Sequence, residues 1–72
     1  MHSGAAMKVT VNGQERELAA PVTVAALLAT LGMADKRVAV EVNQEIVPRS
    51  RHAEYKVKDN DRVEVVVAIG GG

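Results

Sequence analysis

The residues with the clearest chemical potential are the three glycines that follow the last apolar segment, Gly70, Gly71 and Gly72. Glycine has no Cβ and adopts almost any backbone conformation, so consecutive glycines can pass through a slot too narrow for side chains. Fully extended, three residues span about 10 Å. We therefore expect a tail that threads into the active site of another protein while the folded body docks outside.

The reaction available to this tail is acyl transfer from the carboxylate of Gly72. A peptide α-carboxylate is an anion at neutral pH and therefore a poor acyl donor. Chemistry at this group needs activation, and acyl adenylation by ATP is the natural route. Gly72 would be the modified residue, and Gly70 and Gly71 would provide clearance for threading.

Side chains elsewhere do not indicate a catalytic site. The chain has no cysteine, which excludes disulfides, thiolate nucleophiles and zinc–thiolate sites. His52 stands in a charged loop and is interpreted as a solvent-facing histidine. Asp59 and Asp61 are interpreted as flanking a tight turn. We therefore expect no catalytic residue, no metal site and no cofactor bound by this chain.

The overall charge gives no indication of a nucleic-acid or membrane partner. Nine basic side chains balance nine acidic ones. The most apolar stretch, residues 18–34, is interrupted and rich in alanine, so it is not expected to span a membrane. The N-terminus lacks the pattern of a secretory signal. Together with the absence of cysteine, these features favour a cytoplasmic protein.

One segment is locally basic, because Arg49, Arg51, Lys56 and Lys58 lie close together in the sequence. Such a cluster is usually a solvated surface. The functional alternative is a docking patch for an acidic partner, with Arg49 and Arg51 as the candidate residues.

Hydrophobic periodicity predicts one sheet and one helix. The expected strands cover residues 7–12, 14–18, 38–42, 45–47 and 62–69. The expected helix begins after an N-cap at Thr23 and ends before a left-handed residue at Gly32. Asn12-Gly13 is typical of a two-residue hairpin. Residues 49–58 are expected to form a loop with a helical turn near His52.

The last expected strand has two different faces. Val63, Val65 and Val67 are predicted to face the core. Val66 and Ala68 are predicted to point away from it.

A helix and a sheet that each have one apolar face can close a core only by packing on each other. The first and last strands are the most apolar and are expected side by side in the sheet centre. The predicted fold is α+β, a β-grasp (ubiquitin-like) arrangement in which a mixed sheet of four to five strands packs on one helix. Residues 1–6 are interpreted as a disordered leader or cloning remnant, residues 7–69 as the β-grasp domain and residues 70–72 as a flexible glycine tail.

The ordered set of these motifs resembles the ThiS family of sulfur-carrier proteins in thiamine biosynthesis, within the ubiquitin-like MoaD/ThiS superfamily. The resemblance extends over residues 7–72. The segments that carry it are VTVNG at 9–13, TV at 23–24, LL at 27–28, LG at 31–32, VAV at 38–40, Asn43, IVPR at 46–49, DND at 59–61, VEVV at 63–66 and AIGGG at 68–72. One departure is Asn60, which stands where glycine is common but also accepts positive φ.

The resemblance implies a function for the tail. An E1-like (ThiF-like) adenylyltransferase would use ATP and magnesium to adenylate the carboxylate of Gly72. A persulfide sulfur donor would convert the adenylate to a thiocarboxylate, and a ThiG-like thiazole synthase would accept the sulfur. The chain would then be a protein co-substrate rather than an enzyme.

By analogy with the fold, the outward side of the last strand is a candidate docking surface, formed by Val66 and Ala68 with Ile69 at the start of the tail.

Other functions remain open. The nearest are a sulfur carrier for molybdopterin or for cysteine or methionine synthesis, and a non-covalent ubiquitin-like interaction module. A structural fragment whose glycines come from cloning is a further alternative. The Ala68-Ile69 segment before the glycines favours the thiamine branch.

Overall fold

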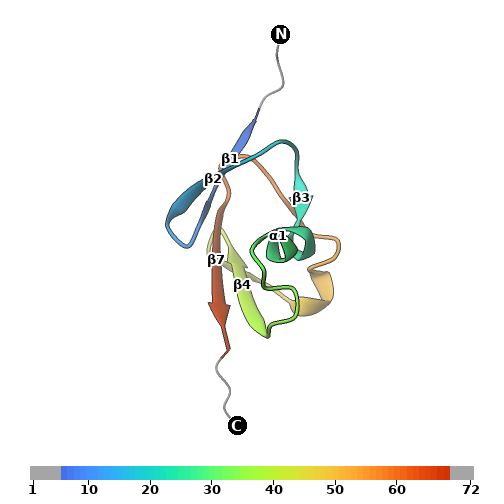
Figure 1. Cartoon of the computed structure of the whole chain (residues 1–72). Helices are drawn as coiled ribbons and strands as arrows, with labels where there is room; N and C mark the ends of the chain where they lie inside the picture. The colour runs from blue at the N-terminus through green and yellow to red at the C-terminus, as the bar shows by residue number, and fades with distance from the viewer. Residues whose placement is uncertain (1–5, 69–72) are drawn as a thin grey trace.

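Helix α1 packs across one face of a mixed five-stranded sheet in the computed structural model, which describes residues 6–68 (Figure 1). The strands and helices in chain order are β1 (Met7–Val11), β2 (Gln14–Leu18), β3 (Val22–Thr23), α1 (Val24–Thr30), β4 (Val38–Val42), β5 (Glu45–Val47), the 3₁₀ helix η1 (Arg49–Arg51), β6 (Lys56–Val57) and β7 (Arg62–Val67). The predictions for residues 1–5 and for Ile69, Gly70, Gly71 and Gly72 lie outside the described residues.

The order of strands in the sheet is β2-β1-β7-β4-β5. β7 runs parallel to β1 and antiparallel to β4, and the two outer pairs are antiparallel hairpins. The first and last strands are therefore neighbours, with β7 in the centre. This arrangement confirms the predicted β-grasp fold.

Both hairpin turns use residues with positive φ. Asn12 and Gly13 have φ of 50° and 83° between β1 and β2, and Asn43 and Gln44 have 53° and 72° between β4 and β5. Two-residue hairpins favour such turns because their twist matches that of the flanking strands. The prediction of a hairpin turn at Asn12-Gly13 is confirmed. In the second turn Gln44 also adopts a positive φ, although it is not a glycine.

Helix α1 begins and ends as its sequence predicts. The Thr23 hydroxyl accepts a hydrogen bond of 3.0 Å from the Ala26 N–H, which satisfies a free donor of the first turn. At the other end Gly32 has φ of 76°, and Met33 N–H donates to Leu28 O at 2.8 Å. This is the left-handed termination that glycine favours.

Replacing Thr23 by alanine is expected to lower the free energy of unfolding by about 1 kcal/mol, because a first-turn N–H loses its acceptor. Urea denaturation followed by circular dichroism measures the change. Thr30→Ala is the matched control: Thr30 Oγ1 only donates, at 3.2 Å, to Ala26 O, so its removal leaves no helix N–H without a partner. Equal losses in the two variants would contradict the capping role.

The core lies between α1 and the inner face of the sheet. Its members are aliphatic and almost fully buried: Met7, Val9, Val11, Val24, Leu27, Leu28, Val40, Val42, Val47, Val57, Val63 and Val65. An isolated helix of seven residues is at best marginally stable in water. Packing of its apolar face against the sheet therefore keeps α1 folded.

Val67 does not join this core, although its phase with Val63 and Val65 predicted that it would. Its side chain is 41% exposed. Helix α1 is only about 10 Å long, whereas a six-residue strand such as β7 spans about 20 Å. The end of the strand therefore extends past the helix, where its cross-strand partner Val38 is also only partly buried.

A second, two-stranded sheet pairs β3 with β6, with Val22 opposite Val57 and Thr23 opposite Lys56. The sequence did not predict these strands, because two residues are too few to show a period. They join the segment after η1 to the start of α1. Val57, which lay in a predicted loop, is fully buried.

His52 is buried, with 8% of its surface exposed, so the prediction of a solvent-facing histidine is wrong. Its Nε2 lies 3.1 Å from Val47 O, and its carbonyl accepts a hydrogen bond of 2.8 Å from Ala25 N–H. η1 turns the chain toward the start of α1, so the imidazole is buried there with its Nε2 within hydrogen-bond distance of a backbone carbonyl. Its role here is structural.

Candidate functional site: the outer face of β7 and the approach to the tail

β7 carries the chain toward the tail, and side chains of both hairpin turns fix this strand in place. Asn12, in the first hairpin turn, makes two hydrogen bonds to the backbone of Val65: its Oδ1 accepts at 2.8 Å and its Nδ2 donates at 3.2 Å. Asn43, in the second turn, accepts a hydrogen bond of 2.9 Å from Arg62 N–H. The two turns therefore hold β7 from both sides, in addition to its ladders with β1 and β4.

The turn before β7 is held by carboxylates. Asp59 Oδ1 accepts a hydrogen bond of 2.8 Å from Lys8 N–H, and Asp61 Oδ2 accepts one of 2.8 Å from Lys58 N–H. Asp61 Oδ1 also accepts from Asn43 Nδ2 at 3.0 Å. Asn60 between them has φ of 71°. These contacts confirm that the two aspartates build a turn.

The predicted docking residues Val66 and Ala68 are exposed, and Val66 has 63% of its surface accessible. Val66 belongs to the outer face, by which we mean the face of the sheet opposite α1. Ala68 N–H donates to Arg37 O at 2.8 Å, so pairing with the chain ahead of β4 continues beyond β7. This hydrogen bond holds Ala68, the last described residue, beside the chain ahead of β4.

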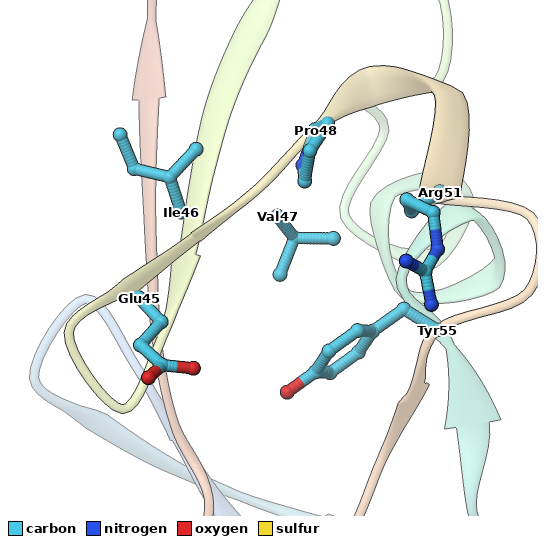
Figure 2. A pocket seen from close by; sticks show the side chains of 6 residues that line it. All are labelled: Glu45, Ile46, Val47, Pro48, Arg51 and Tyr55. Carbon is cyan, nitrogen blue, oxygen red and sulfur yellow. The ribbon is translucent and has the colours of Figure 1, made fainter.

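The structure adds apolar residues to this surface that sequence reasoning missed. Ala39 lies directly opposite Val66 on β4 and is exposed. Ile46 on β5 is 70% exposed and points away from Val47, as Figure 2 shows. Alternation along the two strands was the available signal: Ala39 precedes the buried Val40 on β4, and Ile46 precedes the buried Val47 on β5. Val67, which was assigned to the core, is also exposed at the end of β7.

Arg49 and Arg51 do not join Val66 and Ala68 in one surface. After Pro48 the chain turns from the edge strand β5 toward the helix, so Arg49 lines a hollow together with Ala25 and Leu28. The segment that carries both arginines lies beside α1 in Figure 1, away from β7. Arg49 therefore lies on a different surface from Val66 and Ala68, and Arg51 meets the outer face only at the edge of β5, where it lines a hollow together with Ile46.

A second hollow, of about 120 Å³, lies at the edge of β5 and is lined by Glu45, Ile46, Val47, Pro48, Arg51 and Tyr55. Figure 2 shows the Tyr55 hydroxyl directed toward the Glu45 side chain, with Arg51 above the ring. Arg51 Nε lies 2.9 Å from Glu54 Oε2. The hollow brings together no nucleophile and base, so its geometry does not indicate a catalytic site.

Within residues 6–68 no three His, Asp or Glu side chains converge as metal ligands would. No helix in the same range has the length and apolar character needed to cross a bilayer.

Comparison with known proteins gives consistent matches. A family model described as "ThiS family" matches residues 9–72. The chain is 36% identical over 66 residues to the sulfur carrier protein ThiS of Escherichia coli, a match that covers 92% of this chain and 100% of that protein. A crystal structure of the thiamine biosynthesis protein ThiS from Geobacter metallireducens superposes with a TM-score of 0.79 at 38% identity, covering 92% of this chain and 100% of the other.

A much longer protein is also similar. A thiazole synthase from Paramagnetospirillum magneticum is 52% identical over 66 residues, a match that covers 92% of this chain. The chain spans only 20% of the length of that synthase. A domain of this type therefore forms part of a synthase polypeptide in that organism.

Proposed function

Because the chain belongs to the ThiS family, we propose that it is a sulfur carrier of thiamine biosynthesis whose Gly72 carboxylate is adenylated and then converted to a thiocarboxylate. The observation that carries the proposal is the family match, which continues through the glycine tail to residue 72. The relative from Escherichia coli is named a sulfur carrier protein.

The proposed reaction has three steps at the carboxyl group of Gly72. First, a carboxylate oxygen attacks the α-phosphorus of ATP bound with magnesium in an E1-like adenylyltransferase, and pyrophosphate leaves. Second, the terminal sulfur of a persulfide attacks the acyl carbon, and AMP leaves. Third, a thiol attacks the donor sulfur of the resulting acyl disulfide, so that the S–S bond breaks, a disulfide forms between the thiol and the donor, and the thiocarboxylate leaves. The chain supplies the acyl group and acts as a co-substrate.

A ThiG-like thiazole synthase is the proposed acceptor of the sulfur. The similarity to a domain of the thiazole synthase from Paramagnetospirillum magneticum supports this pairing. The folded body supplies the docking surface, and the glycines supply the reach. ATP-dependent activation makes the cytoplasm the proposed location.

Intact-mass spectrometry tests the proposal. The protein is incubated with its adenylyltransferase, MgATP and a persulfide donor, and we expect the mass increase of an oxygen-for-sulfur exchange, located at Gly72 by fragmentation. Two controls are a chain without Gly72 and a chain extended by one alanine after Gly72; neither should gain sulfur at its end. Unchanged product from the extended chain would contradict the proposal. Thiazole phosphate formation by the synthase then identifies the pathway, and transfer to a dithiolene product would instead indicate molybdopterin synthesis.

A further inference from the structure

Two carboxylates lie directly opposite each other in the middle of the outer face. Glu41 on β4 is the cross-strand partner of Glu64 on β7. Side chains in such positions have Cβ atoms about 4.5–5.5 Å apart, and like charges there destabilise the sheet. Within residues 6–68 the ion pair is that of Arg51 with Glu54. Glu41 and Glu64 therefore have no ion-pair partner among these residues.

Apolar side chains flank this pair. On β7 the next outward residue after Glu64 is Val66, which is 63% exposed, and Ala39 lies opposite it. On the other side, Ile46 lies opposite Glu41 and is 70% exposed. Exposed apolar groups therefore border the two carboxylates toward the end of β7 and toward β5, while Arg62 lies on the same face toward the start of β7. A cation surrounded by apolar side chains would complement this surface in both charge and hydrophobicity.

We propose that the outer face docks on the thiazole synthase through an arginine of that enzyme, whose guanidinium bridges Glu41 and Glu64. Arginine suits this position because its planar group can donate to two carboxylates at once and tolerates an apolar surround better than lysine. The inference rests on the proposed function, since it assumes that the synthase receives the tail.

The position of the pair agrees with delivery of the tail. Glu64 precedes Ala68 by four residues, which is about 13 Å along an extended strand. The bridging arginine would therefore lie on the enzyme surface outside the channel that admits the glycines. Val66 and Ala39 lie between the carboxylates and the tail, where apolar contacts would exclude water around the entrance.

Glu64→Gln and Glu41→Gln test the proposal, because each removes one charge and keeps the shape of the side chain. The dissociation constant for the thiazole synthase is measured by calorimetry at low and high salt. We expect each variant to bind about tenfold more weakly at low salt and to show a flatter salt dependence. Glu45→Gln is the matched control: Glu45 precedes the outward-facing Ile46 on β5 and its side chain is directed toward Tyr55 instead (Figure 2), so loss of its charge should leave binding unchanged.

The thermal midpoint of the free protein gives a readout that a purely structural role would not produce. Removing one of two opposed like charges should raise the midpoint by about 1–4 °C while binding weakens. Binding of Glu64→Gln and Glu41→Gln at the wild-type constant would overturn the proposal. So would weaker binding accompanied by a lowered midpoint, because the glutamates would then act through the fold.

The same proteins separate this inference from the proposed function. If the wild-type chain gains no sulfur in the mass assay, the proposed function fails whatever the dissociation constants are. If it gains sulfur and the glutamine variants bind the synthase as tightly as wild type, only the docking inference fails.

Discussion

Gly71→Val is expected to reduce thiocarboxylate formation at least a hundredfold while the domain remains folded. A β-branched side chain restricts the backbone and adds bulk where the proposed route through the partner admits only glycine. Displacement of a reacting group by about 1 Å can cost a hundredfold in rate. The rate of sulfur incorporation, followed by intact-mass spectrometry at saturating adenylyltransferase, measures the effect.

Gly71→Ala is the graded control for this variant, since a methyl group should slow the reaction less than an isopropyl group. The buried core consists of residues between Met7 and Val65, so we expect both variants to unfold at the wild-type temperature. A Gly71→Val protein that forms the thiocarboxylate at the normal rate would show that the tail does not pass through a narrow channel.

Leu27→Ala is expected to have the largest effect on stability. Leu27 is 1% exposed and is the largest fully buried side chain in the core. Truncation of a buried leucine costs about 2–5 kcal/mol, because apolar contacts are lost and a cavity remains. A domain of this size has only about 4–11 kcal/mol of stability. We expect a large drop in the urea midpoint and partial unfolding at 37 °C.

Ile46→Ala is the matched control, because it removes the same number of atoms from a residue that is 70% exposed. Its free energy of unfolding should change by less than about 0.5 kcal/mol. If the two variants were destabilised equally, the assignment of Leu27 to the core and of Ile46 to the outer face would be wrong.

The elements that the sequence predicts well are those whose signals are local. The Asn12-Gly13 turn, the Thr23 cap and the Gly32 termination each follow from the conformational preferences of one or two residues, and the structure confirms all three. Alternation in the longer strands also determines which faces are apolar. Because one helix can cover only one face of one sheet, these local signals were sufficient to predict the β-grasp fold.

The errors arise where burial depends on residues distant in the sequence. His52 is buried because η1 brings it under the start of α1, and nothing in its charged neighbourhood indicates this. Val67 has the phase of a core residue, but its exposure depends on where a short helix ends. Strands β3 and β6 are too short to have a period and form only because the fold places them together.

The site was predictable in part. The sequence indicated Val66 and Ala68 as outward-facing residues, and the structure confirms their exposure. The role of Gly70, Gly71 and Gly72 stays a prediction. Arg49 lies on another surface and Arg51 lies at the edge of β5, and this placement was not predictable because it depends on the turn of the chain after Pro48. The opposition of Glu41 and Glu64 requires the register between β4 and β7, which only the structure supplies.

The parallel pairing of β1 with β7 has a consequence for how this protein is made. Thr10 pairs with Arg62 and Val11 with Val63, so the sheet joins the two ends of the chain. Contacts between residues so far apart in sequence slow folding, and they form only after the last strand has been synthesised. A nascent chain that stops before β7 lacks the central strand and the valines that close the core. The first strand therefore has its parallel partner only in chains that extend through β7, and the sheet closes last at its own centre.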